Sequence, residues 1–236
     1  MRTSAARRRE DLALAAGLAV LVLALGPWFD RLSDARFAWH MLQHVLIMLV
    51  AAPLLLLGGP LRRLLAALPQ RVARKLHAIF AFIGSPVPAW LAFALALYVT
   101  HFSPLYEAAL NHPAMHAFEH GLLLSAALVF WNPILAVAPA RPLPFPARVL
   151  YVFVAMPIGA FLALALYTTS HPMYAYYEQR LGWGGALADQ EYGGEIMWLA
   201  GGSVLFVALM LLVARWLRDE RRKALLADRQ LPVAPR

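Results

Sequence analysis

Histidines recur at four-residue intervals in "HPAMHAFEHG", residues 112–121. The stretch holds His112, His116 and His120, with Glu119 beside the last of them. On an α-helix, residues four apart share one face and lie about 6 Å apart along the axis. Because imidazole binds copper, zinc, iron and nickel, this spacing predicts one wall of a metal site.

A second histidine pair has the same spacing. "WHMLQH" places His40 and His44 on one face of another expected helix. Each pair begins about three residues into an apolar segment, so the two pairs should lie at the same depth in a membrane. Ionisable side chains inside a membrane are costly unless they face a cavity or a partner. We therefore expect His40, His44, His116 and His120 to converge on one metal site.

Further candidate ligands flank these pairs. Glu119 is expected to orient a histidine ring from behind. The entrance to the metal site is expected to be lined by His112, His101 and His171. For His101 and His171, a purely interfacial position at the membrane surface is an equal alternative. The structural alternative for all the histidines is hydrogen bonding between helices, or a place in an interfacial belt with aromatic residues. That belt would include Trp39 and Tyr106.

Methionine thioethers favour cuprous ion. Three methionines lie close to the histidines in sequence, namely Met41, Met115 and Met173. Three others lie deep in apolar segments and are assigned to core packing, namely Met48, Met156 and Met210.

The composition indicates an integral membrane protein. Of the 236 residues, 61% are hydrophobic and only 14% are charged. The absence of cysteine excludes disulfides, iron–sulfur clusters and thiolate metal sites. The formal charge of +8 does not indicate a nucleic-acid-binding protein, because the basic residues sort by membrane side and do not gather on one soluble face. We find no motif for hydrolytic or nucleotide chemistry.

Six segments are long and apolar enough to cross a bilayer. They are 12–29, 38–59, 86–103, 115–135, 148–169 and 194–216. The sequence thus predicts an all-α, polytopic membrane bundle with a basic N-terminus (1–11), a six-span domain (12–216) and a basic C-terminal tail (217–236). With both termini cytoplasmic, 18 of the 21 basic residues lie inside, which satisfies the positive-inside rule.

The same topology places seven of the eight histidines on the outer side and leaves only His77 inside. A basic amphipathic stretch at 61–80 is expected to lie on the anionic inner leaflet. Gly201 and Gly202 are expected to allow close helix approach in the last span.

Four stretches resemble a known family: "WHMLQHVLIMLVAAPLLLLGGP", "HAFEHGLLLSAALVFWNPIL", "ALYTTSHPMYAYY" and "DQEYGGEIMWLAGG". Together they extend over about residues 37–215, and they are similar to the multi-pass CtaG family of cytochrome c oxidase assembly factors, of the bacterial membrane type. The resemblance implies a protein of the bacterial plasma (inner) membrane that is needed to make an active haem–copper oxidase, through copper handling and contact with an oxidase subunit. It implies no ligand set, so the histidine assignments depend on the topology.

Three functions are open at this point. The first is a non-enzymatic assembly factor that holds copper at the outer-face histidines and passes it to the oxidase within the lipid bilayer. The second is a membrane b-type cytochrome or metal oxidoreductase, in which histidines of the second and fourth spans ligate haem. The third is a copper uptake permease, which ranks last because the inner halves of those two spans are nearly all apolar.

Overall fold

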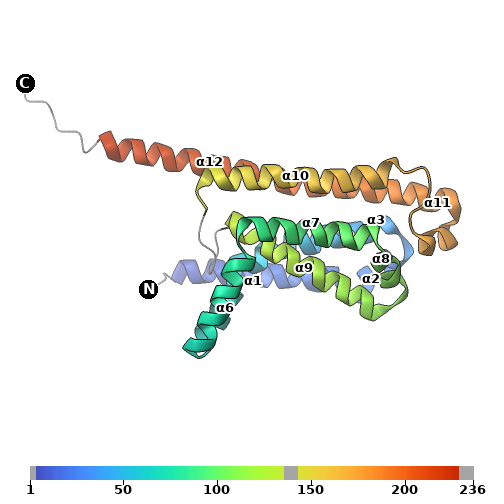
Figure 1. Cartoon of the computed structure of the whole chain (residues 1–236), viewed down its shortest axis with the longest axis horizontal. Helices are drawn as coiled ribbons and strands as arrows, with labels where there is room; N and C mark the ends of the chain where they lie inside the picture. Colours follow the sequence, from blue (N-terminus) through green and yellow to red (C-terminus); the bar gives the residue numbers. More distant parts are fainter. Residues whose placement is uncertain (1–3, 136–142, 229–236) are drawn as a thin grey trace, which may run out of the picture.

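The computed structural model describes residues 4–135 and 143–228, and every regular element in these two ranges is helical (Figure 1). The elements in chain order are α1 (Ser4–Ala24), α2 (Pro27–Ala35), α3 (Phe37–Val45), η1 (Leu46–Ala51), α4 (Ala52–Gly58), α5 (Pro60–Ala67), α6 (Gln70–Ile83), α7 (Pro86–Phe102), α8 (Pro104–Asn111), α9 (Pro113–Leu135), α10 (Phe145–Thr168), α11 (Ala175–Ile196), η2 (Met197–Gly201) and α12 (Gly202–Asp228).

Four helices in the described ranges are long and apolar enough to cross a membrane, or up to six if each of two bent pairs forms one span. Three predicted spans coincide with continuous helices, over Phe37–Gly58, Pro113–Leu135 and Phe145–Thr168. The predicted first span bends by 48° between α1 and α2. The all-helical fold is therefore confirmed, while the count of six spans and the orientation of the termini stay predictions.

Helices extend past several predicted boundaries. α1 begins at Ser4 and α12 continues to Asp228, so no break separates the predicted tails at 11 and 216 from the spans. The segment between the fifth and sixth spans, expected as an outer loop, forms α11. Its one interruption is Gly182, whose φ of 70° is open to glycine at little steric cost.

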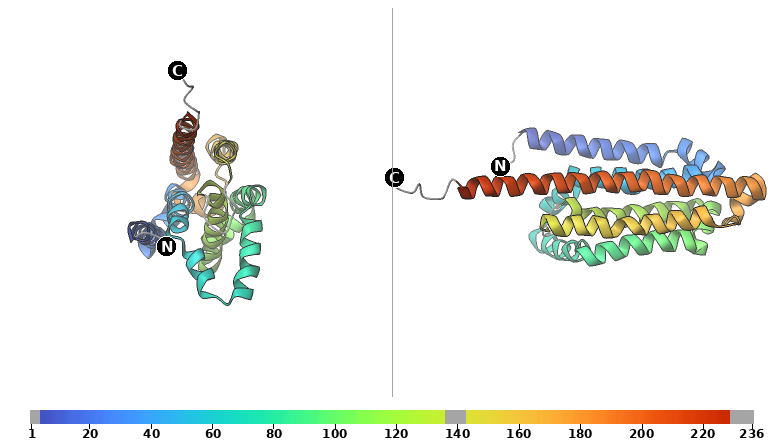
Figure 2. Two further views of the ribbon diagram at one scale, coloured as in Figure 1. Left: turned by 90° about the vertical axis from the view of Figure 1, so that its left-hand side faces the viewer. Right: turned by 90° about the horizontal axis from the view of Figure 1, so that it is seen from above.

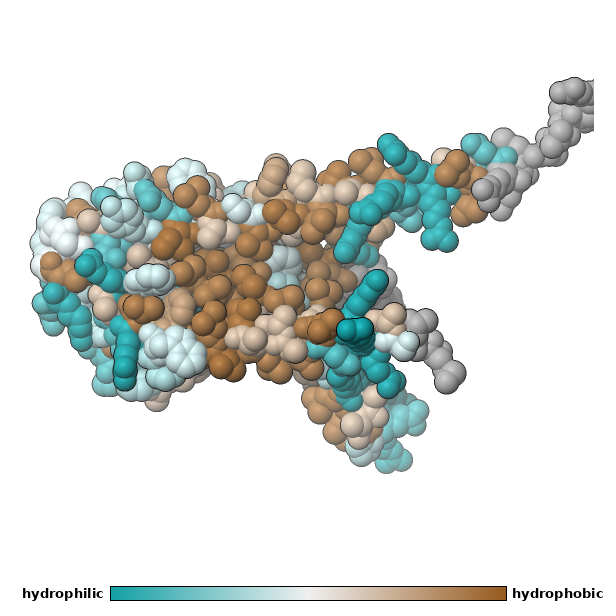
Figure 3. Space-filling model, turned by 180° about the vertical axis from the view of Figure 1, so that it is seen from behind, coloured by the Kyte–Doolittle hydropathy of each residue, from teal (hydrophilic) through white to brown (hydrophobic). Residues whose placement is uncertain are grey.

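The helices form an elongated bundle in which α10 and α12 lie side by side (Figures 1 and 2). α7 packs along α9, and α1 packs along α4. The visible face in Figure 3 has an apolar waist between two more hydrophilic ends, as expected where acyl chains surround a protein. α6 points away from the bundle at 70° to α7 (Figure 2), a direction that suits a helix lying along a membrane surface.

Small residues set the closest helix approaches around α11. A Cβ on Gly193 would meet the Phe37 ring at 2.3 Å, and one on Gly194 would meet the Ala163 carbonyl oxygen at 2.9 Å. Gly201 meets Leu49 only at an ordinary 3.5 Å. The close approach predicted for Gly201 and Gly202 is therefore wrong, because the tight contact falls two turns earlier, where α11 fits between α3 and α10.

A contact between distant parts of the chain fixes the start of α3. The Phe37 amide donates to Asp189 Oδ2 at 2.6 Å, and the pair is buried. Arg36, the N-cap residue, makes no side-chain hydrogen bond of its own to the helix. α11 thus supplies the capping oxygen that a local residue ordinarily provides, and this tertiary cap holds α3 in place.

Two stretches of π-helix interrupt the predicted second and sixth spans. They are η1, between α3 and α4, and η2, between α11 and α12. The indole of Trp131 on α9 donates to the Met48 carbonyl in η1 at 2.9 Å, so a backbone group in the irregular turn is paired inside the bundle. π-turns of this kind are frequent at functional sites.

Candidate metal centre

Four side chains from α3 and α9 meet at one buried point. His40, His44, Glu119 and His120 each offer one ligand atom, and these four atoms lie within 4.8 Å of one another. The Nε2 atoms of His40 and His44 are 3.5 and 3.7 Å from the two Glu119 carboxylate oxygens. A zinc-like ion takes ligands at about 2.0–2.1 Å, so small side-chain rotations would close this group around one ion.

Two more histidines border this group. The His116 ring lies 5.0 Å from that of His40 and 4.2 Å from that of His120, measured between centroids. The His101 ring on α7 lies 5.4 Å from that of His44 and is 1% exposed. The rings of the two i,i+4 pairs therefore lie next to one another, although His116 is outside the group of converging ligand atoms. α7 adds a fifth imidazole from a third helix.

Hydrogen bonds on the far side of two rings set their tautomers. His101 Nδ1 donates to the Leu97 carbonyl at 2.7 Å, which leaves Nε2 with its lone pair free. His40 Nδ1 lies 3.4 Å from the Tyr177 hydroxyl, which itself donates to the Ser33 carbonyl at 2.7 Å. Because that hydroxyl proton is already used, the hydroxyl accepts from Nδ1. His40 Nε2 then presents a lone pair to the cluster, as in metal-bound histidines.

The cluster concentrates buried polar atoms that have no hydrogen-bond partner. Eight of the twelve such side-chain atoms in the described residues belong to five histidines and Glu119. A buried acceptor without a donor costs free energy, and several acceptors facing one another repel. A cation or shared protons would satisfy them together, so the donor set fits a metal ion.

Aromatic side chains pack against the histidine rings of the cluster. The Tyr106 ring on α8 is fully buried, 5.0 Å from His40 and 4.3 Å from Tyr174 between centroids. Burial raises the pKa of the Tyr106 phenol well above its ordinary value, so the hydroxyl stays protonated. The alternative place for Tyr106 in an interfacial belt does not fit its full burial against the histidine rings. Trp39 is 42% exposed and fits such a belt.

Several predicted site residues lie elsewhere. His112 and His171 are exposed, and neither belongs to the group of converging ligand atoms in the described residues. The expectation that His101 lines the entrance is wrong, since it is buried beside His44. Glu119 does not orient a ring from behind, because its carboxylate faces the ring nitrogens of His40 and His44.

The packing predicted for two methionines is confirmed, since Met48 belongs to the buried apolar core and Met156 packs against it. Met48 and Met156, assigned to packing, line a cavity of about 390 Å³ that also reaches Met197 and His44. Met210 is 43% exposed, and Met41 is fully buried against Gly193 of α11. Sequence reasoning missed Tyr177 and Asp189 because nothing local connects them to α3. The place of Glu119, by contrast, could have been read from its three-residue spacing to His116, which puts both on one face.

The fold and the site define a class: an all-helical protein with four to six candidate membrane spans and a buried histidine and carboxylate cluster. The chain belongs to the family of cytochrome c oxidase caa3 assembly factors, whose model (Caa3_CtaG) matches residues 2–219. This confirms the resemblance found in the sequence.

Curated relatives come from mycobacteria. The uncharacterized proteins Mb0105 of Mycobacterium bovis and MT0111 of Mycobacterium tuberculosis are each 30% identical over 229 residues. The uncharacterized protein ML1998 of Mycobacterium leprae is 29% identical over the same length. Each alignment covers 90% of this chain and 35% of the relative, so the chain spans about a third of their length. No solved structure matches the chain significantly.

Proposed function

We propose that this protein is a non-enzymatic assembly factor that holds copper at His40, His44, His120 and Glu119 and passes it to a haem–copper cytochrome c oxidase in the bacterial plasma membrane. The observation that carries the proposal is the meeting of four ligand atoms within 4.8 Å in a buried site. The family supports the role in oxidase assembly. The chemistry of the ligands supports copper as the cargo. Contact with an oxidase subunit is part of the proposal.

The donor set suits a cargo that must leave again. Three imidazoles and one carboxylate carry at most one negative charge, so they do not form the closed anionic cage of a permanent site. His101 and His116 lie beside the four ligands and offer further nitrogens, which would let an ion change ligands stepwise. Buried imidazole and thioether ligands are typical of copper sites.

The geometry favours an ion over haem. Two histidines that ligate one haem iron must stand on opposite faces of a flat macrocycle. Here the rings of His40, His44 and His120 lie 4.5 to 5.6 Å apart between centroids, with the Glu119 carboxylate beside them. This packing leaves no slot for a porphyrin between the helices, so the b-type cytochrome is the weaker hypothesis.

Metal analysis of purified protein tests the proposal. The full chain in detergent should bind one copper ion at this site, and the His44→Ala, His120→Ala double variant should bind one ion fewer than the wild type. His171→Ala is the matched control, since this histidine is exposed and should leave binding unchanged. Equal copper content in the wild type and the double variant would contradict the proposed site.

Oxidase activity in a deletion strain tests the assembly role. Deleting the gene should lower haem–copper oxidase activity under copper limitation, and added copper should restore part of it. The double variant should fail to complement the deletion, whereas His171→Ala should complement it. Normal oxidase activity in the copper-limited deletion strain would refute the assembly role whatever the purified protein binds.

A further inference from the structure

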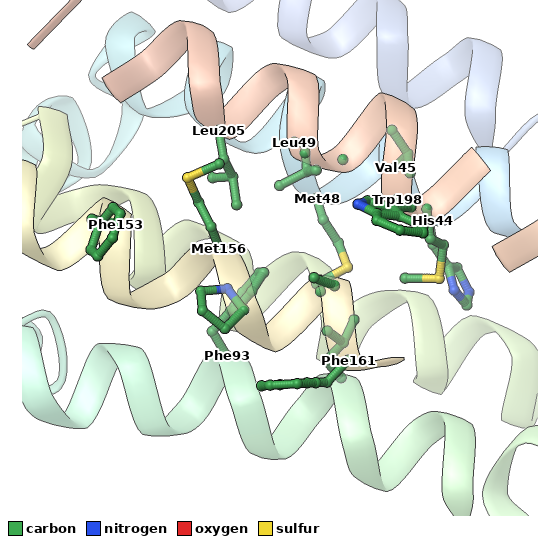
Figure 4. A pocket seen from close by; sticks show the side chains of 17 residues that line it. His44, Val45, Met48, Leu49, Phe93, Phe153, Met156, Phe161, Trp198 and Leu205 are labelled. Atoms are coloured by element: carbon green, nitrogen blue, oxygen red, sulfur yellow. The ribbon is translucent and has the colours of Figure 1, made fainter. Parts of the chain in front are cut away.

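One cavity adjoins the histidine cluster. It has a volume of about 390 Å³ and is bounded by α3, η1, α7, α10, η2 and α12. His44 lies at one end of it and Phe153 at the other (Figure 4). His44 is the single ionisable residue in its wall, and both ring nitrogens of His44 lack hydrogen-bond partners. The cavity therefore begins at a side chain of the proposed copper site.

Three of the eight methionines line this cavity, each from a different element. Met48 lies four residues after His44, Met156 comes from α10 and Met197 begins η2. Met48 and Met197 are 3% and 9% exposed. Methionine is long, unbranched and flexible, so its thioether can move across a cavity of this size. Thioethers are soft ligands that select cuprous ion over zinc.

Two of the three methionines lie in irregular stretches of backbone, and the third adjoins a proline inside a helix. Met48 and Met197 belong to the two π-helical segments. Met156 precedes Pro157, which removes the amide that would pair with the Phe153 carbonyl in a regular helix. Irregular backbone inside a membrane occurs where it is buried in protein or lines a cavity, and π-turns are frequent at functional sites.

The cavity opens on the lateral face of the bundle. Phe153, Phe161 and Trp198 line it and are 62%, 64% and 52% exposed. The apolar waist is the part of the surface that would face lipid, so an ion leaving here would stay inside the membrane. Glu119 lies 3.7 Å from His44 and would balance the charge of a monovalent ion near this end.

We propose that Met48, Met156 and Met197 form a second, thioether site for cuprous ion, adjoining His44 and leading from the histidine cluster to the lateral opening. The inference rests on the proposed copper function and adds to it the oxidation state and the exit route. Transfer is a ligand exchange, in which copper leaves imidazole nitrogen for thioether sulfur and stays cuprous throughout. No electron moves, and each released imidazole recovers its lone pair.

The test combines metal stoichiometry with X-ray absorption at the copper edge. The full chain in detergent is titrated anaerobically with cuprous ion against a chelator, and separately with zinc. We expect the wild type to bind two cuprous ions and one zinc ion, with sulfur among the copper ligands. The M48L/M156L/M197L variant should bind one cuprous ion without sulfur ligands and one zinc ion. Methionine to leucine conserves volume, so the variant should fold.

Matched controls separate the possible results. Met210→Leu changes an exposed methionine and should behave as the wild type. Retained zinc binding in the triple variant shows that the histidine cluster is intact. A wild type that binds one cuprous ion through nitrogen and oxygen alone, or a triple variant with unchanged stoichiometry, would overturn the thioether site and leave the histidine site standing. A wild type that binds neither metal would refute the proposed function itself.

Discussion

Glu119 is the one acidic side chain in the proposed copper site, and it faces two imidazoles while fully buried. Unpaired burial of a carboxylate is costly, so a cation among the ring nitrogens would stabilise it most. The carboxylate also distinguishes ions by charge, because its attraction to a divalent ion is twice that to a monovalent one.

Glu119→Gln should therefore weaken zinc binding more than cuprous binding. We expect about a 10- to 100-fold loss of zinc affinity, the range found when groups that support a metal site are removed. Chelator competition with the purified protein measures both affinities. Glu195→Gln, at an exposed position of α11, is the control. Equal losses for both ions would show that Glu119 acts through packing and not through charge.

At the scale of elements, α11 positions the site without contributing a proposed ligand. Asp189 caps α3 at its first residue, and Tyr177 accepts from His40 Nδ1. Gly193 lets the Phe37 ring pack directly on the α11 backbone. Three contacts from one helix thus fix the end of α3 that bears His40. The acidic segment 189–195 acquires a structural role here through Asp189.

Asp189→Ala should lower the free energy of unfolding by about 1–3 kcal/mol, because it leaves the buried Phe37 amide without an acceptor. Asp189→Asn should cost less, since the amide oxygen still accepts. Thermal unfolding in detergent gives the stabilities, and copper titration shows whether the site loosens as well. Glu195→Ala serves as the surface control. The tertiary cap would be disproved by a Tm for Asp189→Ala that matches this control.

At the scale of the whole molecule, the distribution of charge predicts the orientation. Basic residues outnumber acidic ones at the two ends of the chain, and α5 is tied to α1 by Arg62–Glu10 and Arg63–Asp11 ion pairs of 2.6 Å. These pairs hold α5 beside the N-terminal end of α1. The proposed copper site lies at the other end of the bundle, near the start of α3.

Reporter fusions should place a tag at Gly182 outside and a tag at Arg222 inside the cell. The physical reason is the excess of arginine and lysine in the segments assigned to the cytoplasm. Paired alkaline phosphatase and fluorescent protein fusions read the two sides independently. An inside signal at Gly182 would reverse the bundle and move the histidine cluster to the cytoplasmic half.

The sequence by itself determined the long apolar helices and the placement of each histidine pair on one helix face. Both follow from local rules: the length of an apolar run and the 3.6-residue period that puts His40 with His44 and His116 with His120 on one face. The meeting of the two pairs was predicted from their expected common depth, and it also required the two spans to face each other.

Only the tertiary structure decided which other residues join them. Asp189 reaches Phe37 across 152 positions and Tyr177 reaches His40 across 137, and no local period records such contacts. The burial of His101, the fold of α8 over the rings and the cavity shared by Met48, Met156 and Met197 likewise depend on how helices pack. The bends and π-turns belong here too, because in a membrane a helix departs from regular geometry only where its neighbours satisfy the freed backbone groups.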